Sequence, residues 1–191
     1  MANPYIPREL VHAWSDDMAD APQNHAAALQ RLLKDQRRLT RFIEENAASM
    51  HPATAGICNY MVGVVTRIFD LAGGRLKSAT WAQVREAEAR IGAQVPELLP
   101  LGDGFVERAR ALSRAQPHIL DEALMALFMT EVGEDEEEPE PTELLKVYLM
   151  MWIASEVLDA NWRAPKDFEG PSEYAYVHIE PRSRDTDASE D

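Results

Sequence analysis

Two segments of the chain are strongly apolar, and the first carries apolar residues around most of a helical circumference. This pattern restricts the folds open to the chain. The first begins at Pro52 and continues to about residue 72. The second covers residues 142 to 160 and includes the longest apolar run, Leu144 to Ala154, in which Lys146 is the charged residue. A helix that is apolar on nearly all sides is usually buried by other elements. We therefore expect both segments at the centre of an all-α domain.

Glycine, proline and capping residues divide the rest of the chain into further helices. Thr80 and Gln83 have the spacing of a capping box, Pro117 suits the first position of a helix, and Asn24 and Thr142 are the expected caps of two others. The chain is thus predicted to be all-α, a single-domain bundle of about six or seven helices. With the two central segments included, the expected helices are 8–19, 24–48, 52–72, 80–92, 103–112, 117–128 and 142–160.

Composition separates a globular part from an arm and a tail. We assign residues 1–165 to one all-α globular domain, which includes an acidic connector at 133–141. Residues 166–180 are expected to form an extended arm, because EYAYVHIE alternates with the period of an extended chain. Residues 181–191 nearly lack apolar side chains, so a disordered acidic tail is expected there. No apolar run reaches the roughly 20 residues of a membrane span, and we expect a cytoplasmic protein.

Negative charge is concentrated in the connector. The net charge is −14, and residues 131–143 hold eight acidic side chains and no basic one. Because nucleic acids and anionic membranes carry the same sign, this charge disfavours both as partners. A strongly basic protein would meet the connector first, so its central acids are candidate partner contacts: Glu134, Asp135, Glu136, Glu137 and Glu138. The alternative is that the connector is only a solvated hinge between two helices.

A second candidate interaction surface is basic. The stretch RLLKDQRRLTRF places four cations on one side of the helix expected at 24–48, opposite its leucines, with an aromatic residue beside them. Arginine around an aromatic side chain is common in interaction hot spots. The residues are Arg31, Lys34, Arg38, Arg41 and Phe42. Two alternatives stay open: another helix covers Phe42 while the cations are merely solvated, or the connector folds against the basic side.

Two short patterns near the N-terminus have metal-ligand spacing. Glu9 and His12 match the E-x-x-H pair of di-iron bundles, but no other histidine follows a glutamate at this distance. Asp16, Asp17 and Asp20 resemble the D-D-x-x-D magnesium motif of all-helical prenyl-transferring and terpene-cyclising enzymes. The resemblance covers these five positions, and no second such motif follows. We keep these residues as secondary metal-ligand candidates and predict no metal site.

No catalytic signature names a reaction. The serines lack a G-x-S-x-G turn, the glycines lack the spacing of a phosphate loop, and the single cysteine, Cys58, lies in an apolar helical pattern. We therefore predict no catalytic residue and no cofactor. The leading hypothesis is a non-enzymatic interaction module, an adaptor, regulator or immunity-type inhibitor, that binds a protein partner through charged surface. A helical small-molecule or metal-binding protein is the first alternative, and a nucleic-acid-mimicking inhibitor is the second. Nothing in the sequence sets the oligomeric state.

Overall fold

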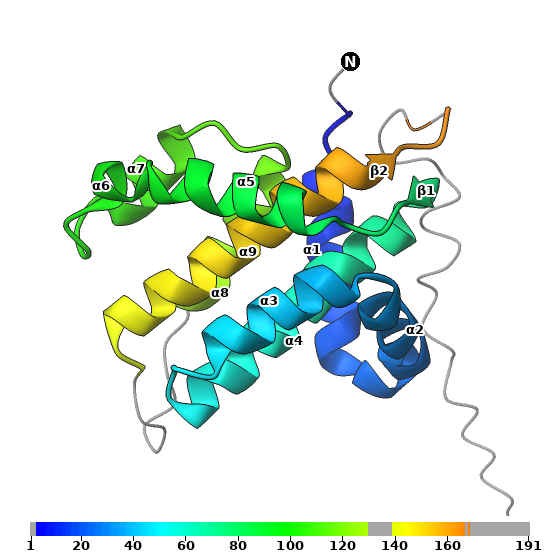
Figure 1. Cartoon of the computed structure of the whole chain (residues 1–191), viewed down its shortest axis with the longest axis horizontal. Helices are drawn as coiled ribbons and strands as arrows, with labels where there is room; N and C mark the ends of the chain where they lie inside the picture. Colours follow the sequence, from blue (N-terminus) through cyan, green and yellow to red (C-terminus); the bar gives the residue numbers. More distant parts are fainter. Residues whose placement is uncertain (1–2, 130–138, 167, 169–191) are drawn as a thin grey trace, which may run out of the picture.

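The computed structural model describes residues 3–129, 139–166 and 168, and in these residues the chain is an all-α bundle, as predicted (Figure 1). Two more helices occur than expected, because one predicted helix is divided and one short helix was missed. The described helices are α1 (Arg8–Asp20), α2 (Pro22–Asp35), α3 (Arg37–Ala47), α4 (Pro52–Leu71), α5 (Trp81–Gly92), α6 (Val95–Leu98), α7 (Phe105–Ala111), α8 (Pro117–Phe128) and α9 (Pro141–Asn161).

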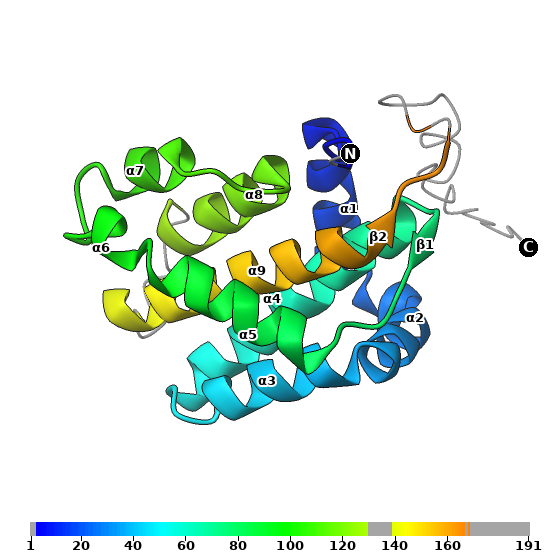
Figure 2. The same ribbon diagram turned by 45° about the horizontal axis from the view of Figure 1, so that its top comes forward.

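Helices α4 and α9 form the centre of the bundle, which confirms the expectation from their apolar sequences. They run side by side, and α5 and α8 pack on other sides of α9 (Figure 2). Trp152, Met151 and Leu158 of α9 are fully buried. On α4 the Cys58 side chain is also fully buried, and burial raises the pKa of its thiol to about 11. This cysteine therefore packs in the core, in agreement with its apolar helical pattern.

The helix predicted at 24–48 is instead two helices that meet at Gln36. α2 begins at Pro22 rather than Asn24, because proline is well suited to a first helical position. Gln36 is 3% exposed, and its amide bridges to the segment before α5. It donates to the Lys77 carbonyl at 3.0 Å and accepts the Ala79 N–H at 2.9 Å. The backbone at Gln36 departs from helical geometry, with φ −96° and ψ 28°, and the two side-chain bonds tie this junction to the segment before α5.

Two other helix starts test the expected caps. The capping box is confirmed: Thr80 Oγ1 accepts the Gln83 N–H, and Gln83 Oε1 accepts the Thr80 N–H at 2.9 Å. At the start of α9 the prediction is wrong, because Pro141 occupies the first turn and Thr142 lies inside the helix. The fixed φ of proline makes it an effective helix opener without a side-chain cap.

A short antiparallel strand pair, which the sequence analysis did not predict, joins two distant segments of the domain. β1 (Arg75–Leu76) pairs with β2 (Trp162–Arg163), so that Leu76 lies opposite Trp162. The Trp162 Nε1 donates to the Gly73 carbonyl at 2.8 Å, and Phe168 packs edge-on against the Trp162 ring. Strands of two residues are too short to produce a visible period. The rest of the predicted arm and tail, 169–191, lies outside the described residues.

Among the described helices, none is long and apolar enough to cross a membrane.

Candidate functional site

The four cations predicted on one side of a single helix lie on two helices in the structure. Because the chain turns at Gln36, Arg31 and Lys34 belong to α2, whereas Arg38 and Arg41 belong to α3. Arg31 lies 3.7 Å from the Asp70 carboxylate. The Arg38 guanidinium donates to the Ala79 carbonyl at 3.3 Å, and Arg41 Nε donates to Glu45 at 2.8 Å. The four cations therefore do not form the continuous surface expected from a single helix.

Phe42 is not on the surface. Its ring is 1% exposed and belongs to the same core as Leu39 and Ile43. The expectation that Phe42 lies among exposed cations is wrong, because α5 packs against α3. From α5, the Arg85 guanidinium lies 5.7 Å from the centre of the Phe42 ring. The alternative in which another helix covers this residue is the one that the structure shows.

A basic and aromatic hollow lies where α3 meets α5. We call it the arginine–tryptophan hollow; its volume is about 420 Å³, and it is lined by Arg37, Arg38, Arg41 and Trp81. Trp81 is 37% exposed, so part of its large apolar side chain is open to solvent. Sequence reasoning missed Trp81 because it lies about 40 positions from the arginines and only the packing of α3 on α5 brings them together. Arg37 also lines the hollow and was not predicted, although it is next to the predicted Arg38 in the sequence.

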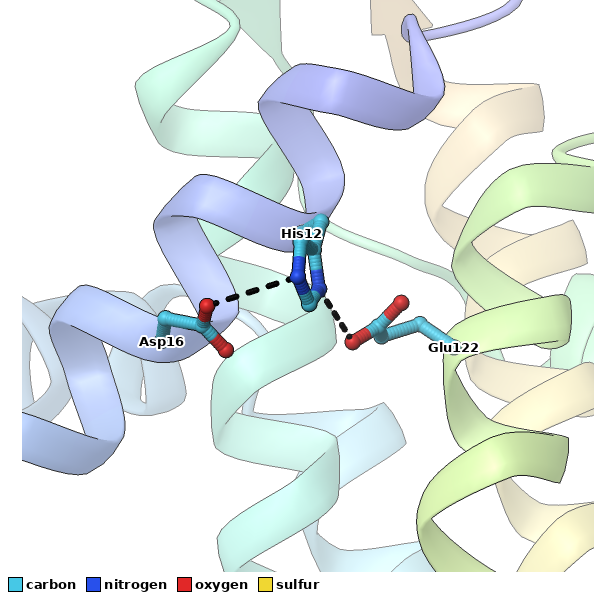
Figure 3. A group of neighbouring side chains, drawn as sticks. All are labelled: His12, Asp16 and Glu122. Atoms are coloured by element: carbon cyan, nitrogen blue, oxygen red, sulfur yellow. Dashed lines mark hydrogen bonds and ion pairs between the residues drawn. The ribbon is translucent and has the colours of Figure 1, made fainter. Parts of the chain in front are cut away.

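A second arrangement joins α1 to α8 (Figure 3). The His12 ring lies between two carboxylates: Nδ1 is 3.0 Å from Glu122 Oε1, and Nε2 is 3.5 Å from Asp16 Oδ2. The side chains of His12 and Asp16 are each 62% exposed, whereas Glu122 is 27% exposed. One potential ligand atom from each residue lies within 4.8 Å of the others. We call this group the α1–α8 cluster.

The α1–α8 cluster combines only part of the two predicted metal patterns. His12 and Asp16 are present, one helical turn apart, but Glu9, Asp17 and Asp20 are not members. Instead, the Asp17 carboxylate lies 2.9 Å from the buried His25 ring. Glu122 was missed because it follows His12 by 110 positions and no local pattern marks it.

An apolar pocket adjoins the α1–α8 cluster. It has a volume of about 210 Å³ between α1, α4 and α8, and both Asp16 and Glu122 line it. The hydroxyl of Ser15, also in the lining, is buried and has no hydrogen-bond partner among the described residues. The remaining walls are mainly aliphatic, from residues that include Met61, Val64, Ile68, Ile119 and Ala123. A small apolar group could therefore enter beside two carboxylates.

The α1–α8 cluster should make His12 titrate above its ordinary pKa. The hydrogen bond and charge of Glu122 raise the pKa of His12 most, Asp16 raises it further, and Arg8 and slight burial oppose them. Because the folded pKa exceeds the unfolded value of about 6.5, this group stabilises the fold below pH 6.5 and loses that contribution as pH rises through the folded pKa. An NMR titration should show the raised pKa, and Glu122→Gln should move it toward 6.5; no movement would contradict the pairing.

The predicted connector residues Glu134 to Glu138 lie outside the described residues. Their role as partner contacts stays a prediction. Comparison of the chain with protein families, with curated proteins and with solved structures finds no match.

Proposed function

We propose that the protein is a non-enzymatic interaction module that binds an acidic segment of a protein partner in the arginine–tryptophan hollow. The observation that supports this proposal is that three arginines and one exposed tryptophan line a single hollow. The earlier expectation of a basic partner concerned the connector, outside the described residues. A partner that binds the hollow would instead be acidic. Of the predicted partner-binding residues, Arg38 and Arg41 line the hollow.

The two residue types in the hollow have complementary roles. A guanidinium can hold a carboxylate with two parallel hydrogen bonds, so several arginines favour closely spaced acidic side chains. An exposed ion pair contributes only about 0 to 1 kcal/mol, which makes the charges alone a poor source of affinity. Trp81 adds a large, rigid apolar surface with a hydrogen-bonding edge, and tryptophan and arginine are enriched among residues that dominate binding energy.

The net charge of −14 does not prevent such binding. At physiological ionic strength, charges on a protein surface are largely screened beyond about 8 Å. An acidic segment in the hollow would therefore respond mainly to the nearby charges, which are the lining arginines and Glu45, whose carboxylate is 2.8 Å from Arg41. The chain's own acidic connector is a competing occupant by the same chemistry, and the experiment must distinguish it from a separate partner.

The test is capture of partners from the cells that make the protein, with the full chain as bait, followed by affinity measurement on the captured partner. Trp81→Ala and the pair Arg38→Ala with Arg41→Ala should each weaken binding by at least about tenfold, the range of a hot spot. Arg75→Ala, which removes an exposed arginine from β1, is the matched control and should change affinity little.

Two results would count against the proposal. One is a partner that binds the hollow variants as tightly as the natural chain. The other is an equal loss of affinity in Arg75→Ala, which would indicate a response to net charge alone. Deletion of residues 134–140 then identifies the role of the connector. Stronger binding after the deletion indicates that the connector occupies the hollow, unchanged binding excludes it as a recognition element, and lost binding assigns recognition to it.

A helical small-molecule or metal-binding protein remains the second candidate function. The α1–α8 cluster and its adjoining apolar pocket favour it specifically. The nucleic-acid-mimicking alternative depends on connector acids outside the described residues, and no described feature supports it.

A further inference from the structure

We propose that His12, Asp16 and Glu122 form a binding site for one divalent transition-metal ion, which would join α1 to α8. This site is separate from the arginine–tryptophan hollow and does not depend on the proposed interaction function. Its ligands come from two helices that meet only in the folded chain. In the part of the chain that the structure describes, this is the one group of three potential ligands so closely spaced.

The spacing of the ligand atoms is close to what an ion requires. Metal bonds of about 2.1 Å in a tetrahedral arrangement place ligand atoms about 3.4 Å apart. In the α1–α8 cluster the three atoms are within 4.8 Å of one another, and His12 to Asp16 is already 3.5 Å. His12 and Asp16 lie one turn apart on the same side of α1. Their side chains are well exposed and can rotate, so the remaining closure requires no movement of the helices.

The donor set selects the class of ion. An imidazole nitrogen with two carboxylates suits zinc, cobalt, manganese or ferrous iron, whereas magnesium and calcium prefer oxygen ligands alone. Two carboxylates also balance the charge of a divalent ion, so the occupied site would be neutral with a neutral imidazole. In the structure the two carboxylates approach different nitrogens of the His12 ring, Glu122 at Nδ1 and Asp16 at Nε2, so one carboxylate must turn toward the nitrogen that holds the ion (Figure 3).

The apolar pocket adjoins the proposed metal site. Asp16 and Glu122 belong to the α1–α8 cluster and also line the apolar pocket, so a further ligand of the ion could extend into the pocket. Three protein ligands leave at least one coordination position for water or another ligand, as in open metal sites. The unpartnered Ser15 hydroxyl lines the same space.

Calorimetric titration of the metal-free full chain with zinc chloride tests the proposal. We expect one bound zinc ion per chain, and His12→Ala, Asp16→Asn and Glu122→Gln should each lower its affinity by at least about tenfold, since even the loss of a ligand's hydrogen-bond partner costs 10- to 100-fold. Glu9→Gln and Asp17→Asn are matched controls on α1 that should leave the affinity within about twofold. Circular dichroism confirms that each variant is folded.

A second measurement separates this site from zinc held weakly by other acids. Zinc should raise the melting temperature of the natural chain, because an ion that binds only the folded state stabilises it. It should not do so in His12→Ala. The proposal is overturned if no zinc binds, if His12→Ala and Glu122→Gln bind as tightly as the natural chain, or if Glu9→Gln weakens binding as much as His12→Ala. The last result would place the ion at the E-x-x-H pair instead.

Discussion

Replacing Trp152 by alanine should lower the free energy of unfolding by about 3 to 5 kcal/mol, the usual cost of removing a buried aromatic side chain. Trp152 lies in the middle of α9 and is fully buried. Its ring packs against Tyr148, and its Nε1 donates to Glu156 at 3.2 Å. Alanine would therefore leave a cavity beside the central helix pair and an acceptor short of one donor. Guanidinium or thermal unfolding measures the loss.

Trp81→Ala is the matched control for this prediction. It removes the same side chain from a position that is 37% exposed at the start of α5. Trp81 buries less apolar surface on folding than Trp152 does. Trp81→Ala should therefore cost less than half as much stability as Trp152→Ala. Equal losses in the two variants would contradict the central position of α9. The same Trp81 variant serves the partner-binding experiment, where a stable fold is required.

Asp121→Asn should cost about 3 kcal/mol, because it removes the counter-charge of a buried arginine. Arg114 is 8% exposed, and its Nη1 donates to Asp121 Oδ1 at 2.8 Å. Arg110 approaches the same carboxylate at 3.6 Å. Asparagine nearly keeps the shape of aspartate, so the loss reports charge rather than packing. Breaking a buried ion pair usually costs about 3 to 5 kcal/mol. We expect the lower value because Arg114 still donates to the Arg110 carbonyl.

Glu88→Gln provides the comparison for an exposed ion pair. Glu88 binds Arg85 at 2.8 Å, but both side chains are well exposed, so its loss should cost no more than about 1 kcal/mol. A double replacement, Arg114→Met with Asp121→Leu, should recover much of the stability lost in Asp121→Asn, because no charge is then left buried. If Asp121→Asn costs no more than Glu88→Gln, the Arg114 pair does not behave as buried.

The elements that sequence patterns located correctly depend on nearby residues. The capping box of α5 involves two residues three positions apart, and Pro117 opens α8 by its own ring geometry. The division of the predicted helix at Gln36 could not be predicted from nearby residues. The Gln36 side-chain amide hydrogen-bonds to backbone groups 41 and 43 positions away. The β1–β2 pair likewise depends on a contact between distant segments.

The candidate sites show the same division. Local patterns marked Arg38, Arg41, His12 and Asp16, since each belongs to a recognisable helical spacing. Their partners, Trp81 and Glu122, carry no local signal. The prediction placed Phe42 beside the cations because it used only the angular position of Phe42 on its helix. In the structure Phe42 is buried, and α5 packs against α3.

The sequence by itself therefore determined that the chain is all-α, which two helices lie at its centre, and where most helices begin and end. These properties follow from apolar periodicity and from backbone preferences of single residues, which act over one or two turns. Only the tertiary structure decided which surfaces combine. The arginine–tryptophan hollow and the α1–α8 cluster each need side chains from helices far apart in the sequence, and burial of apolar faces against α4 and α9 brings those helices together.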